Sequence, residues 1–172
     1  ATVVTLRLGV GGDNVVASAP GDDALSVLPG FHTRGCLGEA MAEVAVIEPI
    51  EFVPSSVGTA ARIRLQVTPT DAGRAEIHSI QSTPLLTFDA ENPSTQFAID
   101  LEIAPGSEQT VIEIPLVPQR CDPHVVQEDK VGTVLVFDVS VEGVDGQITV
   151  PTPPEMKAAI LTWVGEWCEF GS

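Results

Sequence analysis

Apolar residues recur at every second position over much of this chain, and this alternation limits its fold more than any other feature. The pattern is clearest in residues 60–67, 97–103 and 135–142. A period of two indicates a strand with one buried face. Turn-forming residues, such as those at 69–73 and 105–107, follow roughly every 8–12 residues, which is typical of an antiparallel sandwich or barrel. No helices separate these strands, which disfavours a parallel α/β fold. The sequence therefore predicts a mostly-β fold, an antiparallel immunoglobulin-like β-sandwich.

The two parts of the chain, residues 1–57 and 58–172, give signals of different strength. In the first part, apolar and polar residues alternate over 3–8, and a hairpin-like turn follows at 9–14. Residues 19–41 look irregular. Pro49 interrupts a β-branched run at 44–53. A proline inside such a run indicates an edge strand or a bulge. We expect residues 1–57 to add strands to the same domain or to form a small second lobe. Residues 58–172 should hold the sandwich, with a turn at Val144–Gln147, and a C-terminal helix.

The C-terminal helix is predicted from its start signal and its apolar face. Thr152-Pro153-Pro154-Glu155 reads as a capping box with proline at the first helical position. The residues that recur at helical spacing are Met156, Ala159, Ile160, Trp163, Val164 and Trp167. A short helix with two tryptophans on one face needs tertiary packing, so we expect it to dock on the sheet. The alternative is that this face fills a groove in a partner.

The charge of the chain excludes some classes of partner. Eight basic and 24 acidic residues give a formal charge of −16, which repels nucleic acid and anionic membrane surfaces and attracts cations or basic partners. The simplest interpretation is a surface that keeps the protein soluble. No apolar run approaches the ~20 residues of a transmembrane helix. The chain starts at Ala1 without the pattern of a signal peptide, so we expect a trimmed sequence or a mature form.

Three cysteines, Cys36, Cys121 and Cys168, leave at least one without an intramolecular disulfide partner. Any of three pairings is possible, and all three could instead be reduced core residues. We favour Cys121–Cys168 because Cys168 ends the predicted helix, which such a bridge would anchor. Cys36 would then be a buried thiol or an intermolecular link.

The densest polar segment, residues 120–130, lies between two predicted core strands. Its possible divalent-metal ligands are Asp122, His124, Glu128 and Asp129. Carboxylates and imidazoles both bind divalent cations, but this spacing matches no standard Ca²⁺ or Zn²⁺ loop. The competing interpretation is a capped turn, in which Asp122 and Pro123 start a short helix. Its carboxylates would then bind backbone N–H groups and the neighbouring cations, Arg120 or Lys130.

Catalytic motifs are not evident. The three histidines are His32, His78 and His124, and the pairs Cys36–His32 and Cys121–His124 lack an orienting third group. No nucleophile elbow, phosphate-binding loop or zinc-protease motif occurs. A hydrolase whose site the sequence does not reveal is the remaining enzymatic alternative. We expect no cofactor.

The run from Arg120 to His124, followed by residues 128–133 and a helix that ends in an aromatic residue and a cysteine, resembles a segment of uncharacterised exported or lipid-anchored proteins of high-GC Gram-positive bacteria. The resemblance covers the last third of the chain. It implies a cell-envelope or extracellular location and a possible lipid tether in the precursor, and it supports the pairing of Cys121 with Cys168. We therefore expect a non-enzymatic exported or cell-surface domain that binds an unknown protein or envelope component.

Overall fold

The computed structural model describes residues 2–10, 13–21, 27–127 and 131–170, which form two compact units, Ala1–Thr33 and Arg34–Ser172. In the first unit, β1 (Thr2–Val10) and β2 (Asp13–Gly21) form an antiparallel hairpin that pairs Val10 with Asp13. The predicted hairpin is therefore confirmed. Helix α1 (Val27–Val44) crosses the boundary between the units. None of the helices in the described ranges is both long and apolar enough to span a bilayer.

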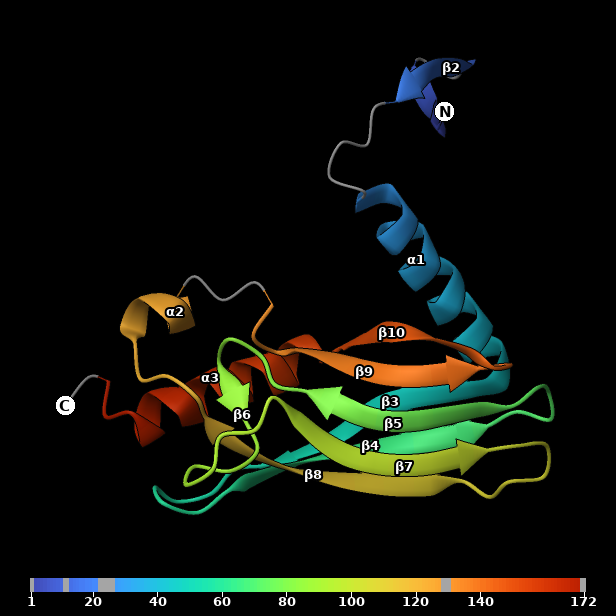
Figure 1. The fold of residues 1–172 in the computed structure, drawn as a ribbon. Coiled ribbons are helices and arrows are strands. Elements are labelled where there is room, and N and C mark those ends of the chain that lie inside the picture. The colour runs from blue at the N-terminus through green and yellow to red at the C-terminus, as the bar shows by residue number, and fades with distance from the viewer. Residues whose placement is uncertain (1, 11–12, 22–26, 128–130, 171–172) are drawn as a thin grey trace. The chain divides into compact units, whose positions relative to one another are not determined.

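The second unit contains two four-stranded antiparallel sheets that pack as a sandwich (Figure 1). The first sheet has the order β3-β4-β8-β6, with β3 (Ala45–Val53), β4 (Ala61–Pro69), β8 (Thr110–Pro118) and the short β6 (Leu86–Thr87). The second has the order β10-β9-β5-β7, with β10 (Val144–Pro151), β9 (Val134–Val141), β5 (Ala75–Gln81) and β7 (Gln96–Ile103). The prediction of a mostly-β antiparallel two-sheet fold is confirmed. β3, from the segment 1–57, is part of the first sheet.

The alternating residues supply the core between the sheets. Ile63 and Leu65 of β4, Ile77 of β5 and Phe137 of β9 have no exposed surface. Their neighbours along each strand face outwards, as the period of two predicts. Burial of each such side chain stabilises the fold by about 1.5–3 kcal/mol.

Bulges interrupt the ladders at two places. In β3 the register shifts between Pro49 and Glu51, and β3 is an edge strand, which confirms the interpretation of Pro49. In the second sheet the register shifts between Ile77 and Ser79 against both neighbours of β5. On the β7 side of this irregularity, Asp100 has a φ of 53°, a left-handed conformation that Asp adopts more readily than most residues.

Helix α1 differs from the sequence analysis, which treats residues 19–41 as irregular. Its composition explains the error, because Pro29, Gly30, Gly35 and Gly38 all weaken intrinsic helix propensity. In the second unit, its buried side chains are Leu37, Met41 and Val44. A Cβ atom at Gly146 of β10 would come within 2.7 Å of Leu37 Cδ2. Glycine therefore allows α1 to lie close to the sheet, and this packing outweighs the weak propensity.

The turn between β9 and β10 also differs from the prediction, which places it at Val144–Gln147. Strand β10 already begins at Val144, and the two-residue turn is Glu142-Gly143, with φ values of 49° and 78°. Positive φ at both positions is the requirement of a type I′ hairpin turn. The Glu142 carboxylate accepts the N–H of Arg74 at 2.6 Å, and the Glu142 N–H donates to the carbonyl of Arg74 at 3.0 Å. These two bonds hold Glu142 in the turn conformation. The turn therefore lies before Asp145-Gly146, the pair at the centre of the predicted turn.

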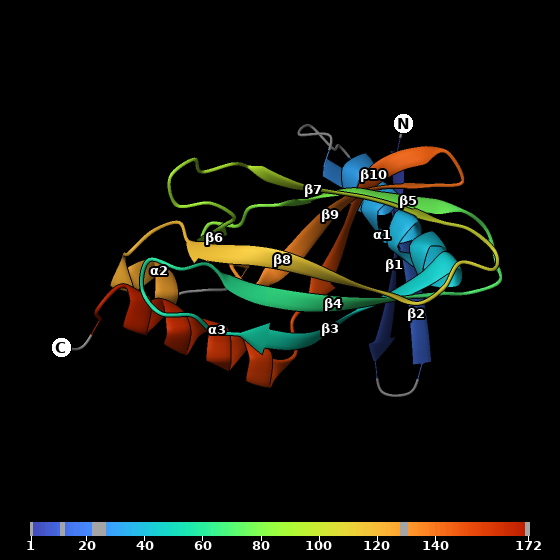
Figure 2. The same cartoon turned by 90° about the horizontal axis from the view of Figure 1, so that it is seen from below.

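The predicted C-terminal helix is present as α3 (Pro154–Trp167), which runs along β3 (Figure 2). Its buried side chains are Met156, Ile160, Trp163 and Val164. Trp163 meets the ring of Phe52 at 5.6 Å between centroids and donates its indole N–H to the carbonyl of Ser55 at 3.0 Å.

The predicted capping box of α3 is wrong. Pro153 is the N-cap and no side chain caps the helix. The hydroxyl of Thr152 instead donates to the carbonyl of Thr133 at 3.1 Å. This bond ties the start of α3 to the residue before β9. A proline does occupy the first helical position, but it is Pro154, one residue later than a cap at Thr152 would give.

Candidate functional site

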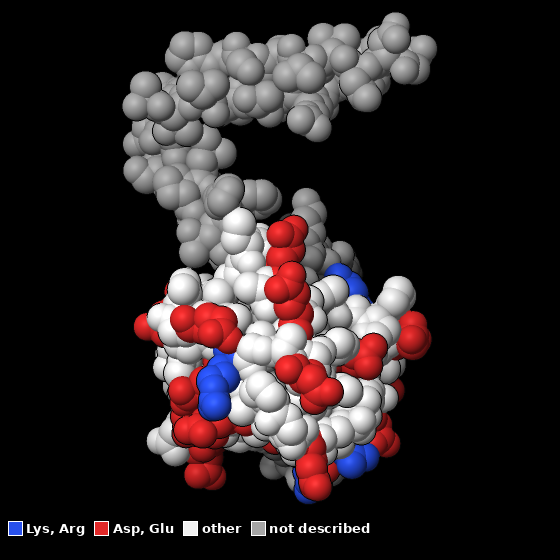
Figure 3. All heavy atoms as spheres, turned by 90° about the vertical axis from the view of Figure 1, so that its right-hand side faces the viewer, with Lys and Arg blue, Asp and Glu red and all other residues white. Residues whose placement is uncertain are grey.

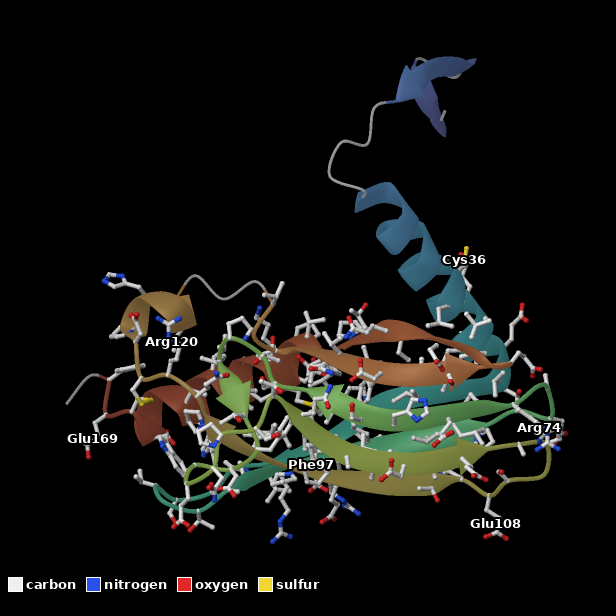
Figure 4. The ribbon with its side chains drawn as sticks, in the orientation of Figure 1. Cys36, Arg74, Phe97, Glu108, Arg120 and Glu169 are labelled. Carbon is white, nitrogen blue, oxygen red and sulfur yellow. A yellow bond between two sulfur atoms is a disulfide. The ribbon has the colours of Figure 1, made fainter. Side chains whose placement is uncertain are left out.

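The polar segment between β8 and β9 is fastened by a disulfide. Cys121 is bonded to Cys168, 47 positions later, at the C-cap of α3. The pairing favoured from the sequence is therefore present, and the alternative of three reduced cysteines is wrong. Cys36 is exposed on α1 (Figure 4), so a buried Cys36 thiol is also wrong.

Asp122 caps the short helix α2 (Pro123–Gln127). Its Oδ1 accepts the N–H of His124 at 3.0 Å, and its backbone carbonyl accepts the N–H of Val126 at 3.3 Å. Its Oδ2 lies 3.9 Å from the guanidinium of Arg120. For Asp122, the structure thus has the arrangement that the capped-turn interpretation describes.

The predicted metal ligands are only partly placed. Asp122 is partly buried and His124 is exposed, whereas Glu128 and Asp129 lie outside the described residues. Within ranges 2–10, 13–21, 27–127 and 131–170, no three His, Cys, Asp or Glu side chains converge as a metal site would require. The four-residue ligand set stays a prediction.

Of the two candidate cysteine–histidine pairs, only Cys121–His124 can be assessed in the described part of the chain, and it does not form a nucleophile. Cys121 is oxidised in the disulfide, so it supplies no thiolate to His124. The side chain of His32 lies outside the description. His78 Nδ1 lies 3.2 Å from Glu76 Oε1 on the same strand.

The most connected carboxylate of the described residues is Asp138, on the outer face of β9. It accepts hydrogen bonds from the hydroxyl of Ser79 at 2.7 Å and from the amides of Gln81, Gln96 at 3.5 Å and Gln147 at 2.9 Å. Ser79 and Gln81 belong to β5, Gln96 to β7 and Gln147 to β10. One side chain therefore links all four strands of the second sheet.

These contacts determine how the Asp138 carboxylate behaves. Partial burial raises its pKa, but the hydrogen bonds from Ser79, Gln147 and Gln81, together with the nearby charge of His78, lower the pKa below its usual value. A carboxylate that is held ionised in this way is a weak base. Its hydrogen bonds join the four strands of the second sheet.

Sequence reasoning missed this cluster because it treated Asp138 as one of many outward residues. The bulge at His78 shifts the alternation, so that Ser79 lies opposite Asp138 while Ile77 and Ile80 both remain buried. The three-residue spacing between the two isoleucines breaks the period of two. That break was the available signal of a bulge.

Charges are distributed unequally between the two sheets. Strands β10, β9, β5 and β7 contain no Lys or Arg, and their carboxylates are Glu76, Asp100, Glu102, Asp138 and Asp145. In the first sheet, Arg64 pairs with Glu51 at 2.7 Å and with Glu113 at 3.1 Å. Acidic side chains also dominate the end of the sandwich that carries the β9–β10 turn (Figure 3).

In comparisons with known proteins, no family model, no curated protein and no solved structure matched this chain.

Proposed function

We propose that this chain is a non-enzymatic domain of an exported protein that binds a positively charged partner through the outer face of the second sheet. We call this surface the acidic face and define it by Glu76, Asp100, Glu102, Asp138 and Asp145. The partner would be a basic protein or another cationic component of the cell envelope.

The unequal charge of the two sheets is the observation that carries this proposal. The first sheet neutralises Glu51 and Glu113 with Arg64, whereas the strands of the acidic face supply no Lys or Arg. Such a surface raises the association rate of a basic partner, in a manner that depends on ionic strength.

The strand register adds a second argument. Glu76 of β5 pairs directly with Glu102 of β7, and like charges at directly opposed positions of a sheet destabilise it. His78 lies beside Glu76 and compensates it only when protonated. A cationic side chain placed over this pair would relieve the repulsion, so the free energy of binding would include that relief.

The proposal that the protein is exported is based on the disulfide. Such bonds form and persist in oxidising compartments and are rare in the cytosol. The bond between Cys121 and Cys168 closes a long loop, which suits a structural disulfide of an exported domain.

We further propose that the sandwich is immunoglobulin-like. The order β3-β4-β8-β6 corresponds to strands A, B, E and D of that fold, and β10-β9-β5 to strands G, F and C, with β7 beside C as strand C′. One departure is that β6, in the place of D, precedes β7 along the chain. An experimental structure in which β7 paired with β8 rather than β5 would contradict this assignment.

A titration with a lysine decapeptide, followed by amide NMR shifts, tests the binding proposal. We expect the largest shifts in β5, β7 and β10, and weaker binding as salt is added. The variant Asp100→Asn/Glu102→Gln should bind less tightly than the matched control Glu48→Gln/Glu166→Gln, which removes the same charge elsewhere. Amide shifts spread evenly over the surface, or an equal loss of affinity for the decapeptide in both variants, would refute the acidic face as the binding surface.

A further inference from the structure

A cavity of about 530 Å³ opens where the edge of one sheet meets the edge of the other. Its walls are the start of β7, the second half of β8, the loop of residues 88–94 and, between β3 and β4, Gly58 and Ala60. Small-molecule sites have volumes of about 300–1,000 Å³, so this cavity is large enough for a small molecule or one side chain. It is distinct from the acidic face, which is the outer surface of one sheet.

The cavity combines apolar walls with acidic groups. Phe88 and Phe97, whose ring centroids are 5.7 Å apart, line it together with Pro115 and Val117. Asp89 and Glu91 are the charged residues in the lining, and no Lys or Arg is among its lining residues, all of which the structure describes. Apolar walls accept an alkyl chain, and carboxylates and aromatic rings both attract an organic cation.

The loop that carries the carboxylates has a defined conformation. Asp89 Oδ1 accepts the backbone N–H groups of Glu91 at 2.8 Å and Asn92 at 3.3 Å. Further along, the hydroxyl of Thr87 donates to the carbonyl of Ser94 at 3.0 Å. These bonds fix the Asp89 side chain and the backbone that carries Glu91, which reduces the ordering that binding would require.

We propose that this cavity receives a lysine side chain of a partner polypeptide. Its butyl stem lies against Phe97, Pro115 and Val117, and its ammonium group lies near Asp89 and Glu91. The two carboxylates repel an anionic group. A purely apolar group displaces water from the carboxylates and supplies no charge or hydrogen bond in its place. This proposal does not depend on the acidic face, because the two surfaces use different residues.

Three blocked amino acids test the chemistry, namely the N-acetyl methylamides of lysine, norleucine and glutamate. NMR titration of the intact chain should show saturable binding of the lysine compound, with shifts at Ala60, Asn92 and Phe97, and much weaker binding of the other two. Equal affinity for lysine and norleucine, or no saturable binding of lysine, would overturn the proposal. Shifts confined to β5 and β10 would support the acidic face instead and reject the cavity.

Variants then test the residues. Glu91→Gln should weaken lysine binding about two- to fivefold, as expected for a solvent-accessible ion pair. Phe97→Leu, which keeps the wall apolar and removes the aromatic ring, should weaken it by a similar factor. Glu108→Gln removes the same charge at the turn beyond the far end of β7 (Figure 4) and should change nothing. Thermal melts verify folding, and a Glu91→Gln variant that is folded and binds lysine with unchanged affinity would refute the assignment.

Discussion

The disulfide between Cys121 and Cys168 gives the most quantitative prediction. The bond closes a loop of 47 positions. For such a loop, the chain-entropy expression predicts that the bond lowers the conformational entropy of the unfolded state by about 14 cal/mol/K. At ambient temperature this corresponds to about 4 kcal/mol of stabilisation. The double variant Cys121→Ser/Cys168→Ser should lose an amount of this order.

The variant should nevertheless fold, because packing holds α3 in place independently of the bond. Met156, Ile160, Trp163 and Val164 are buried, and the indole of Trp163 donates to the carbonyl of Ser55. We therefore expect far-ultraviolet circular dichroism of the variant to match that of the original chain.

Urea unfolding, followed by tryptophan fluorescence, measures the effect. With a slope of about 2 kcal/mol per M, the midpoint should fall by about 2 M. Dithiothreitol should lower the midpoint of the original chain to the same extent and leave the double variant unchanged, whereas Cys36→Ser should have little effect. A loss below about 1 kcal/mol would show that the loop is already constrained in the unfolded state or that native strain cancels the entropy term. Such a small loss would refute this reasoning.

Three further predictions concern single features. The low pKa of Asp138 means that the native state favours its ionised form. The stability that this carboxylate contributes is therefore complete above the unfolded pKa of about 3.9 and is lost as the pH falls through the native pKa. In urea titrations, Asp138→Asn should cost about 1 kcal/mol, and this cost should be constant from neutral pH to about pH 5 and shrink below about pH 4. Gly143→Ala should cost about 1 kcal/mol in the same assay, because φ is 78° and no other atom lies near the new Cβ, and a neutral result would exclude a left-handed turn. If residues 122–129 bind a divalent metal, EDTA should lower the melting temperature and Ca²⁺ or Zn²⁺ should restore it; an unchanged melt would reject the predicted ligands Asp122, His124, Glu128 and Asp129.

The regular strands could be predicted because local pattern and burial agree there. In β4 and β9 each inward position is apolar and each is buried in the structure. In α3, residue spacing identified the four buried residues Met156, Ile160, Trp163 and Val164, whereas the predicted Ala159 is exposed and Trp167 is only partly buried. The edge strand and the bulge at Pro49 could also be predicted, because a strand residue without an N–H is tolerated only at an edge or a bulge.

The features that could not be predicted depend on contacts between distant residues. Helix α1 exists despite its glycines because Leu37 packs against the backbone at Gly146. Glu142 adopts a positive φ because Arg74, 68 positions earlier and directly before β5, supplies its N–H. Thr152 has the sequence of a helix cap but bonds to Thr133 instead. The cluster around Asp138 is assembled from four strands, so no local window of sequence contains it.

The irregular edges of the two sheets have a consequence for how the protein behaves at high concentration. A straight edge strand presents unpaired backbone groups to which another molecule can add a strand, and this is a common route to aggregation. Here the edge strand β3 contains Pro49 and a bulge, and the edge strand β7 is bent where Asp100 has a positive φ. The edge strands β3 and β7 therefore offer no regular ladder to a second copy, whereas the edge strand β10 pairs with β9 without a register shift. We therefore expect addition of a strand at β3 to be disfavoured, and removal of the β3 irregularity by Pro49→Val with deletion of Ile50 to promote fibril formation in concentrated solutions.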